Sequence, residues 1–103
     1  MIIMRNIKLI INSFERNLKI FLYQSEVKED RDITVLILEE CLERLSERKA
    51  LACVAKDYEE YFMILSCASK AERMLEKHID SLGNDNDFIL IYRNVVRLLP
   101  RQK

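Results

Sequence analysis

The only histidine of the chain follows an arginine at a spacing that suits acid–base chemistry on phosphate. Arg73 and His78 are separated by four residues, within a stretch that has the period of a helix. An imidazole changes protonation near neutral pH and can act as a general acid or base, while a guanidinium holds phosphate oxygens. The pair therefore supplies candidate catalytic residues. Because His78 adjoins an apolar stripe, a histidine at the edge of the core is the competing interpretation.

This Arg-x4-His element, Arg73 to His78, is similar to the signature of HEPN-type ribonucleases. The resemblance covers these six residues. It implies an all-helical bundle in which Arg73 and His78 cleave RNA across a dimer. A dimeric ribonuclease is therefore one hypothesis for this chain.

Three cysteines fall within helical pattern rather than in loops. Together with His78 they could be written as a metal-binding set, but the intervening segments of eleven, thirteen and ten residues match no zinc-knuckle spacing. We therefore expect no metal and interpret the thiols as small buried hydrophobes. An odd number of cysteines also favours a reducing, cytoplasmic location over a secreted one. The three are Cys41, Cys53 and Cys67.

Other catalytic templates fail on the residue inventory. One histidine excludes zinc sites with two histidines and the paired Glu-x-x-His ligands of di-iron bundles. One glycine leaves no glycine-rich loop to hold a phosphate or a dinucleotide, so we expect no cofactor. The inventory favours a binding protein over an enzyme.

Composition limits the fold and the partners. A chain of 103 residues, half of them apolar, is long enough for one modest core, and we expect one domain over residues 1–103. A single glycine and a single proline argue against an all-β sandwich, which needs frequent turns. Seventeen basic and seventeen acidic residues give no net field toward nucleic acid. No apolar stretch approaches the roughly 18 residues of a membrane span.

The balanced total hides an uneven distribution of charge. The net charges of segments 1–24, 25–60 and 61–103 are +3, −5 and +2. One interpretation is that these charges lie on oppositely charged faces of one bundle that meet, or on faces that are simply solvated. The other is an acidic surface that recognises a basic protein partner.

An acidic and aromatic run in the middle of the chain has the composition of an interface hot spot. Tyrosines are enriched in such sites, and here two of them stand beside carboxylates. The predicted binding residues are Asp57, Tyr58, Glu59, Glu60 and Tyr61.

The segment Lys49–Leu82 contains no glycine or proline and has a helical apolar stripe. As one helix of 34 residues it would be about 50 Å long, whereas a domain of this size is about 33 Å across. We expect a break, near Lys56 and Asp57 or at the small residues 66–69; otherwise the helix projects and packs on a second copy. The apolar run Tyr61–Leu65 would then be a self-association surface. The stripe consists of Leu51, Val54, Tyr58, Phe62, Leu65, Ala68, Ala71, Leu75, Ile79 and Leu82.

The flanking segments also have the helical period. A basic amphipathic helix is predicted from Met1 to about Gln24, and we favour a core helix over one lying on a membrane surface. The charged segment Ser25–Asp32 is interpreted as a loop in which Asp30 or Asp32 caps the next helix. That helix covers Ile33–Leu45, where the residues up to Leu38 have high strand propensity but the charged continuation favours helix.

Two further turns are expected. The polar run Ser46–Lys49 predicts a tight turn or a sharp bend. Gly83 is a candidate helix C-cap, and Asp85 or Asp87 can cap a last helix that starts near Phe88 and ends at Pro100.

These patterns predict an all-α, compact bundle of four to five helices around one long kinked helix. For function we expect a small cytoplasmic protein–protein interaction module with no catalytic chemistry, such as an immunity protein, an inhibitor, a secretion chaperone or a regulatory adaptor. The alternatives are the HEPN-like ribonuclease and a structural homodimeric bundle.

Overall fold

The computed structural model describes residues 2–23 and 28–100, and the side chains of 7–23 and 29–100. This part of the chain forms helices and no strands, which confirms the predicted all-α bundle. The helices are α1 (Ile2–Tyr23), α2 (Lys28–Ala55), α3 (Tyr58–Glu76), α4 (Ile79–Leu82) and α5 (Asn86–Leu98).

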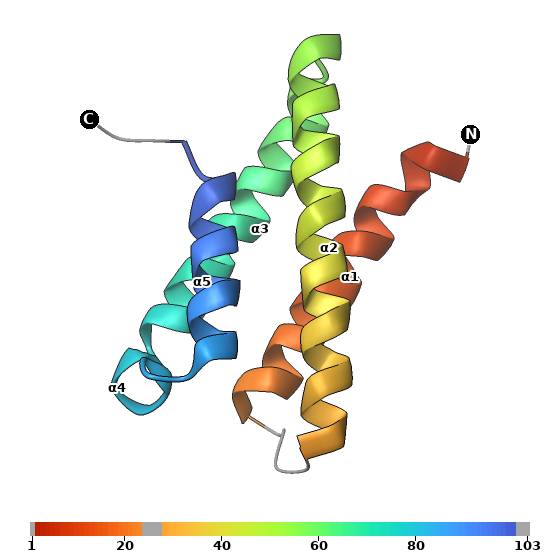
Figure 1. The fold of residues 1–103 in the computed structure, drawn as a ribbon. Coiled ribbons are helices and arrows are strands. Elements are labelled where there is room, and N and C mark those ends of the chain that lie inside the picture. The colour runs from red at the N-terminus through yellow and green to blue at the C-terminus, as the bar shows by residue number, and fades with distance from the viewer. Residues whose placement is uncertain (1, 24–27, 101–103) are drawn as a thin grey trace.

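The helices lie in two layers. Figure 1 shows α2 and α5 in front, with α2 crossing over α1 and α5 crossing over α3. The Cα atoms extend over 40 × 36 × 16 Å, so the molecule is a slab about two helices thick. Each long helix therefore has one side in the core and the opposite side at a broad outer face.

The core lies where the four long helices meet, and every one of them contributes large apolar side chains to it. The N-terminal helix is a core helix, as expected, because α1 buries Phe14 and Leu18 completely. The largest fully buried side chains are Phe14, Leu18, Leu38, Leu45, Ile64, Leu75, Phe88, Ile91 and Val95.

The expected break in the long segment occurs at Lys56 and Asp57, the first of the two predicted places. Lys56 has a φ of 60°, which ends α2 in a left-handed turn. The Asp57 N–H then donates to the Ala52 carbonyl at 2.9 Å, and the Asp57 carboxylate accepts from the Glu60 N–H at 3.2 Å as the N-cap of α3. The small residues 66–69 continue α3 without interruption.

The predicted turn at Ser46–Lys49 is wrong, because α2 runs through it. Two of the polar side chains there are held across the bundle: Arg48 pairs with Glu60, and the Lys49 ammonium donates to the Leu98 carbonyl at 2.6 Å. A polar run without glycine or proline lacks a residue that stops a helix, and these contacts offset the burial of the polar groups.

The predicted loop before α2 is also too long. Residues 28–32 belong to the helix, and 24–27 lie outside the described residues. Asp30 and Asp32 are therefore inside α2 and do not cap it; the Asp30 carbonyl instead accepts from the Thr34 hydroxyl at 2.8 Å. Acidic residues in a first turn favour helix through its dipole, which explains why this charged segment extends α2.

The first half of the predicted apolar stripe is exposed, contrary to expectation. Leu51, Val54, Tyr58 and Phe62 are 63%, 83%, 61% and 60% exposed. The left-handed turn resets the helical phase, so one continuous stripe cannot describe both sides of it. The residues that α3 buries are Glu60, Ile64, Cys67, Ala68, Ala71 and Leu75.

The connection from α4 to α5 follows the prediction in part. Gly83 is the C-cap of α4, but its φ of −61° is not left-handed. A Cβ at position 83 would lie only 2.5 Å from the Ile79 carbonyl oxygen. Glycine fits here because it has no Cβ, and not because of its backbone angles. Asp85, not Asp87, caps α5 by accepting the N–H groups of Asp87 and Phe88. Asp85 also pairs with Arg31 of α2, which joins the start of α5 to its neighbour in the same layer.

The left-handed turn at Lys56 joins α2 to α3, and a substitution there tests this α2–α3 corner. Lys56 is exposed and an L-residue with a side chain is strained at positive φ, so Lys56→Gly should leave the free energy of unfolding unchanged or raise it by up to about 1 kcal/mol. The matched control is Ala50→Gly, at an exposed position inside α2, which should lower it by about 1 kcal/mol. Urea denaturation measures both. Equal losses in the two variants would contradict the assigned corner.

Candidate functional site

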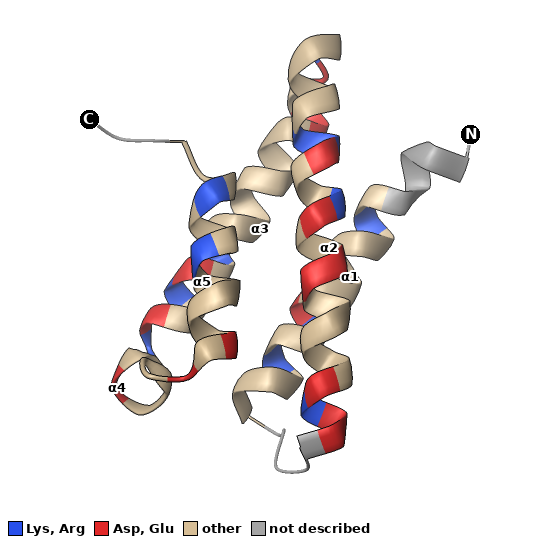
Figure 2. Cartoon of the chain, viewed as in Figure 1, with Lys and Arg blue, Asp and Glu red and all other residues tan. Residues whose placement is uncertain are grey.

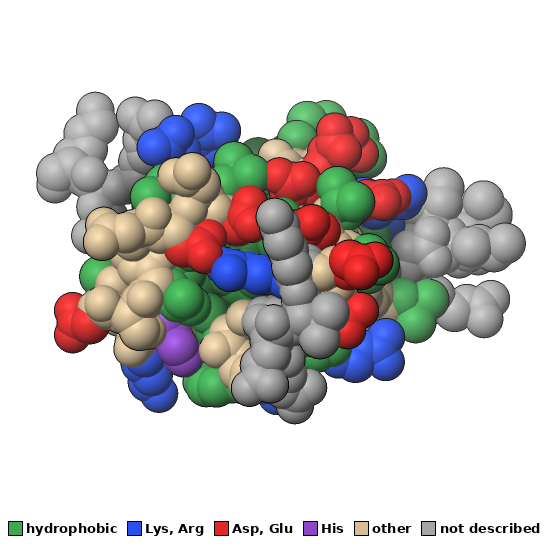
Figure 3. Space-filling view, turned by 60° about the horizontal axis from the view of Figure 1, so that its bottom comes forward, with side chains coloured by type: hydrophobic (Ala, Val, Ile, Leu, Met, Phe, Trp, Pro, Cys, Tyr) green, Lys and Arg blue, Asp and Glu red, His purple; other side chains and the backbone are tan. Residues whose placement is uncertain are grey.

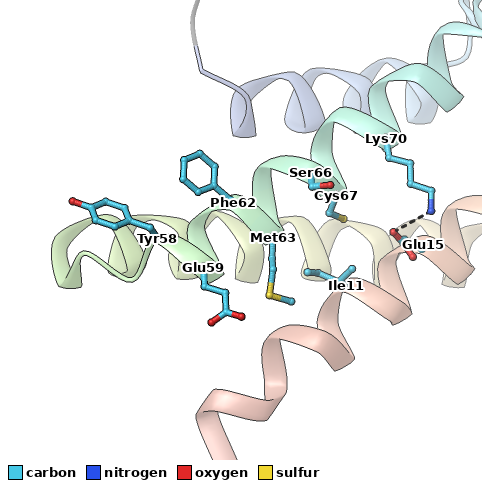
Figure 4. Close-up of a pocket in the computed structure, with 9 residues that line it drawn as sticks. All are labelled: Ile11, Glu15, Tyr58, Glu59, Phe62, Met63, Ser66, Cys67 and Lys70. Carbon is cyan, nitrogen blue, oxygen red and sulfur yellow. Dashed lines mark ion pairs between the residues drawn. The ribbon is translucent and has the colours of Figure 1, made fainter.

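A groove of about 610 Å³ opens between α1 and α3. Figure 4 shows Met63 of α3 and Ile11 of α1 pointing toward each other across it. Toward one end, the Lys70 ammonium lies 3.8 Å from the Glu15 carboxylate. The lining residues are Ile11, Glu15, Tyr58, Glu59, Phe62, Met63, Ser66, Cys67 and Lys70.

Two aromatic rings stand at the other end of the groove. Tyr58 and Phe62 are one helical turn apart, so both project from the outer side of α3, and Figure 4 shows both there. The Tyr61 ring contacts the Phe62 ring edge-on, with centroids 5.5 Å apart. Large exposed rings beside a concave surface are typical of a binding site, because covering them removes apolar area from water.

The five predicted binding residues divide into two roles. Tyr58 and Glu59 line the groove, and Tyr61 is half-buried beside Phe62. Asp57 caps α3, and Glu60 is buried, accepting from Arg48 at 2.8 and 2.9 Å. The carboxylates of Asp57 and Glu60 therefore hold the α2–α3 corner.

Sequence reasoning missed most of the groove. Ile11 and Glu15 come from α1, and no short-range pattern brings α1 to α3. Phe62 was assigned to the buried stripe, and the signal that could have corrected this is Asp57: a capping residue there starts a new helix with its own phase.

Arg73 and His78 do not share a helix. Arg73 is exposed on α3 and donates to the Ser69 hydroxyl at 3.2 Å. His78 follows the end of α3, with its Nδ1 3.0 Å from the Met74 carbonyl and its ring 4.9 Å from the Tyr23 ring. Neither residue lines the α1–α3 groove.

The cysteines also differ from one another. Cys41 and Cys67 are buried, as expected for small hydrophobes, but Cys53 is exposed on α2, where the expectation of burial is wrong. Burial raises the pKa of the Cys67 thiol to about 12 and also raises the pKa of Cys41. Among residues with described side chains, no group of three His, Cys, Asp or Glu could hold a metal ion.

A second groove, also of about 610 Å³, lies between α2 and α5. Four of the glutamates that make the segment 25–60 acidic line this groove. Figure 2 shows acidic residues spaced along α2 and basic residues on α5. Acidic side chains also gather at the end of the molecule that Figure 3 brings forward. Glu40 is paired with Arg44 within α2, at 2.9 Å. The other glutamates of this groove are Glu39, Glu43 and Glu47.

Searches against known proteins returned nothing similar: no family model, no curated protein and no solved structure matches this chain. Within the described residues, no helix combines the length and the apolar character that crossing a membrane requires.

The buried ion pair at the corner gives one prediction. Glu60→Ala should lower the free energy of unfolding by about 3 kcal/mol, because it removes the buried carboxylate that receives two hydrogen bonds from the Arg48 guanidinium, itself only 13% exposed. Its neighbour Glu59 is exposed, so Glu59→Ala should change it by less than about 0.5 kcal/mol. Urea denaturation compares the two. Similar losses would show that the Glu60 pair is unimportant.

The three cysteine thiols give a second prediction. At pH 8 iodoacetamide should label Cys53 rapidly in the folded protein and leave Cys41 and Cys67 unlabelled, because the thiolate is the reactive form and burial raises the pKa of both buried thiols. Peptide mass spectrometry identifies the modified positions. Adding urea before the reagent should expose all three. Labelling of Cys67 at the rate of Cys53 without urea would contradict its burial.

Proposed function

We propose that this chain is a small protein–protein interaction module without catalytic chemistry of its own. It belongs with the functional type of immunity proteins, inhibitors, secretion chaperones and adaptors, and it binds another polypeptide along the α1–α3 groove.

The observation that carries this proposal is the pair of exposed rings at the end of the groove. Tyr58 and Phe62 together leave roughly 200 Å² or more of ring surface in water, since an aromatic side chain can bury about 150–250 Å². The core does not use these rings, because the same helix buries Ile64 and Leu75 on its other side. A partner that covers them gains the free energy of removing apolar area from water.

The groove also has the polar groups that give an interface its orientation. Glu59 lies beside the rings, and the Glu15–Lys70 pair lies toward the far end. An apolar surface with charged groups at its margins is the usual anatomy of a protein interface. The support under it is firm, because the Asp57 cap and the Glu60–Arg48 pair fix the start of α3.

No observation favours the ribonuclease hypothesis. Arg73 contacts Ser69 on its own helix, His78 contacts Met74 and the Tyr23 ring, and neither residue lines either groove described above. Equal RNA cleavage by the wild type and His78→Ala would remove that hypothesis.

Site-specific photo-crosslinking in cells tests the binding surface. A photoreactive amino acid at Phe62 should give a covalent adduct with a polypeptide, because this ring is where we place the contact. The matched control is the same amino acid at Val96, an exposed apolar position on α5, which should give far less adduct. Tyr58→Ser should reduce the Phe62 adduct without changing the free energy of unfolding by more than about 0.5 kcal/mol.

Equal adducts from the two positions, or none from either, would contradict the proposal. An adduct from Val96 alone would place the interface on the other layer of the slab.

A further inference from the structure

The geometry points to a second copy of this chain as the partner in the groove. We propose that two copies pack α3 against α3 in antiparallel fashion, with the two-fold axis at Ser66. This inference rests on the proposed function, since it names the partner of the same surface.

The outer side of α3 is a single stripe whose two halves differ. Six exposed residues follow one another at helical spacing along it, with Glu59 beside the first. The first half is aromatic and acidic, and the second half is basic. The stripe runs through Tyr58, Phe62, Ser66, Lys70 and Arg73 of α3 and ends at Lys77, the C-cap of the helix.

The stripe is complementary to itself about Ser66. Phe62 and Lys70 each lie four residues from Ser66, and Glu59 and Arg73 each lie seven residues from it. A two-fold axis through Ser66 therefore sets Phe62 opposite the second copy's Lys70, and Glu59 opposite the second copy's Arg73. Each contact occurs twice, as a two-fold interface requires. The first is a cation over an aromatic ring, and the second is an ion pair between unlike charges.

The residue at the crossing point is small. Ser66 is exposed and Ser69 is half-buried, so no bulky side chain separates two helices that cross there. Helix axes can then approach to about 8 Å, the short end of the usual range. The neighbouring groove, with Ile11 and Met63, provides apolar surface beside the crossing.

The shape of the molecule leaves this stripe open. In a slab 16 Å deep, α1 and α3 form one broad face, and α2 and α5 lie behind them (Figures 1 and 4). Lys70 is free to change partner, because its 3.8 Å contact with Glu15 is long and its side chain is 57% exposed. Arg73 donates to the neutral Ser69 hydroxyl on its own helix, a contact that an ion pair with a carboxylate can replace.

The contact between the two α3 helices is small, which indicates a weak dimer. A helix of 19 residues is about 28 Å long, and one side of it buries only a few hundred Å². A stable standard interface buries about 800 Å² from each partner. We therefore expect a weak dimer, with a dissociation constant in the micromolar range, that forms and separates with concentration.

Sedimentation equilibrium with charge-reversed variants tests the pairing. The wild type should change from one to two chains per particle as concentration rises. Glu59→Arg and Arg73→Glu should each weaken the dimer about tenfold or more, because each sets like charges opposite each other twice. Mixing the two variants should restore association, since unlike charges then face each other at both pairs of positions. The control Arg93→Glu reverses an exposed charge on α5 and should leave the dissociation constant unchanged.

A covalent trap tests the position of the axis. In a Cys53→Ser background, Ser66→Cys should form a disulfide between two chains under mild oxidation, because the axis brings the two positions within the roughly 7 Å that a disulfide spans. Ser81→Cys, at an exposed position on α4, should crosslink far more slowly. Equal rates would overturn the axis at Ser66.

The outcomes separate this inference from the one on which it rests. A protein that stays monomeric at every concentration, with a Phe62 adduct to a different polypeptide, overturns the dimer and keeps the interaction module. A monomer with no Phe62 adduct removes both. A dimer that is insensitive to Glu59→Arg and Arg73→Glu overturns the proposed pairing.

Discussion

The buried ion pair between Arg48 and Glu60 is the interaction on which the arrangement of α2 and α3 depends. Their side chains are 13% and 9% exposed, and the guanidinium contacts both carboxylate oxygens. A carboxylate turned into the bundle fixes the rotation of α3 about its axis. Because each residue advances about 100° around a helix, positions two before and two after Glu60 point about 160° away from it. These positions are Tyr58 and Phe62, so the same pair that anchors α3 turns both rings outward. Buried ion pairs contribute less to net stability than to a defined geometry, and here the geometry is the exposed side of α3.

Much of the fold could be predicted from the regular spacing of apolar residues along the sequence. Helices rather than strands could be predicted throughout, because apolar residues recur every three or four positions and turn residues are scarce. Asp85 could be predicted as one of two caps, and Lys56–Asp57 as one of two break points. The boundaries of α2 could not be predicted. Its polar segment is stabilised by a partner of Arg48 twelve residues away on α3 and by a partner of Lys49 49 residues away on α5, and such contacts do not appear in a local pattern.

The candidate site was harder to predict for a related reason. Composition pointed to Tyr58 and Glu59, because tyrosine beside carboxylate is a feature of interfaces; both line the groove, and their role in binding stays a prediction. It could not distinguish Glu59 from Glu60, which are adjacent and chemically alike. Only the phase of α3 separates them, and that phase starts anew after the turn at Lys56 and is held by the Arg48–Glu60 pair. The contribution of Ile11 depends on how α1 crosses the bundle, which is a property of the whole core.

The two-layer architecture separates the core from the exposed surface within single helices. In α3 the residues that hold the core, such as Ile64 and Leu75, occupy one side, and the stripe containing Phe62 and Ser66 occupies the other. Substitutions on the outer stripe leave the buried contacts untouched, so the exposed surface of α3 can change while the core stays the same. In a molecule only 16 Å deep, each long helix therefore has an exposed side whose sequence can vary without disturbing the core.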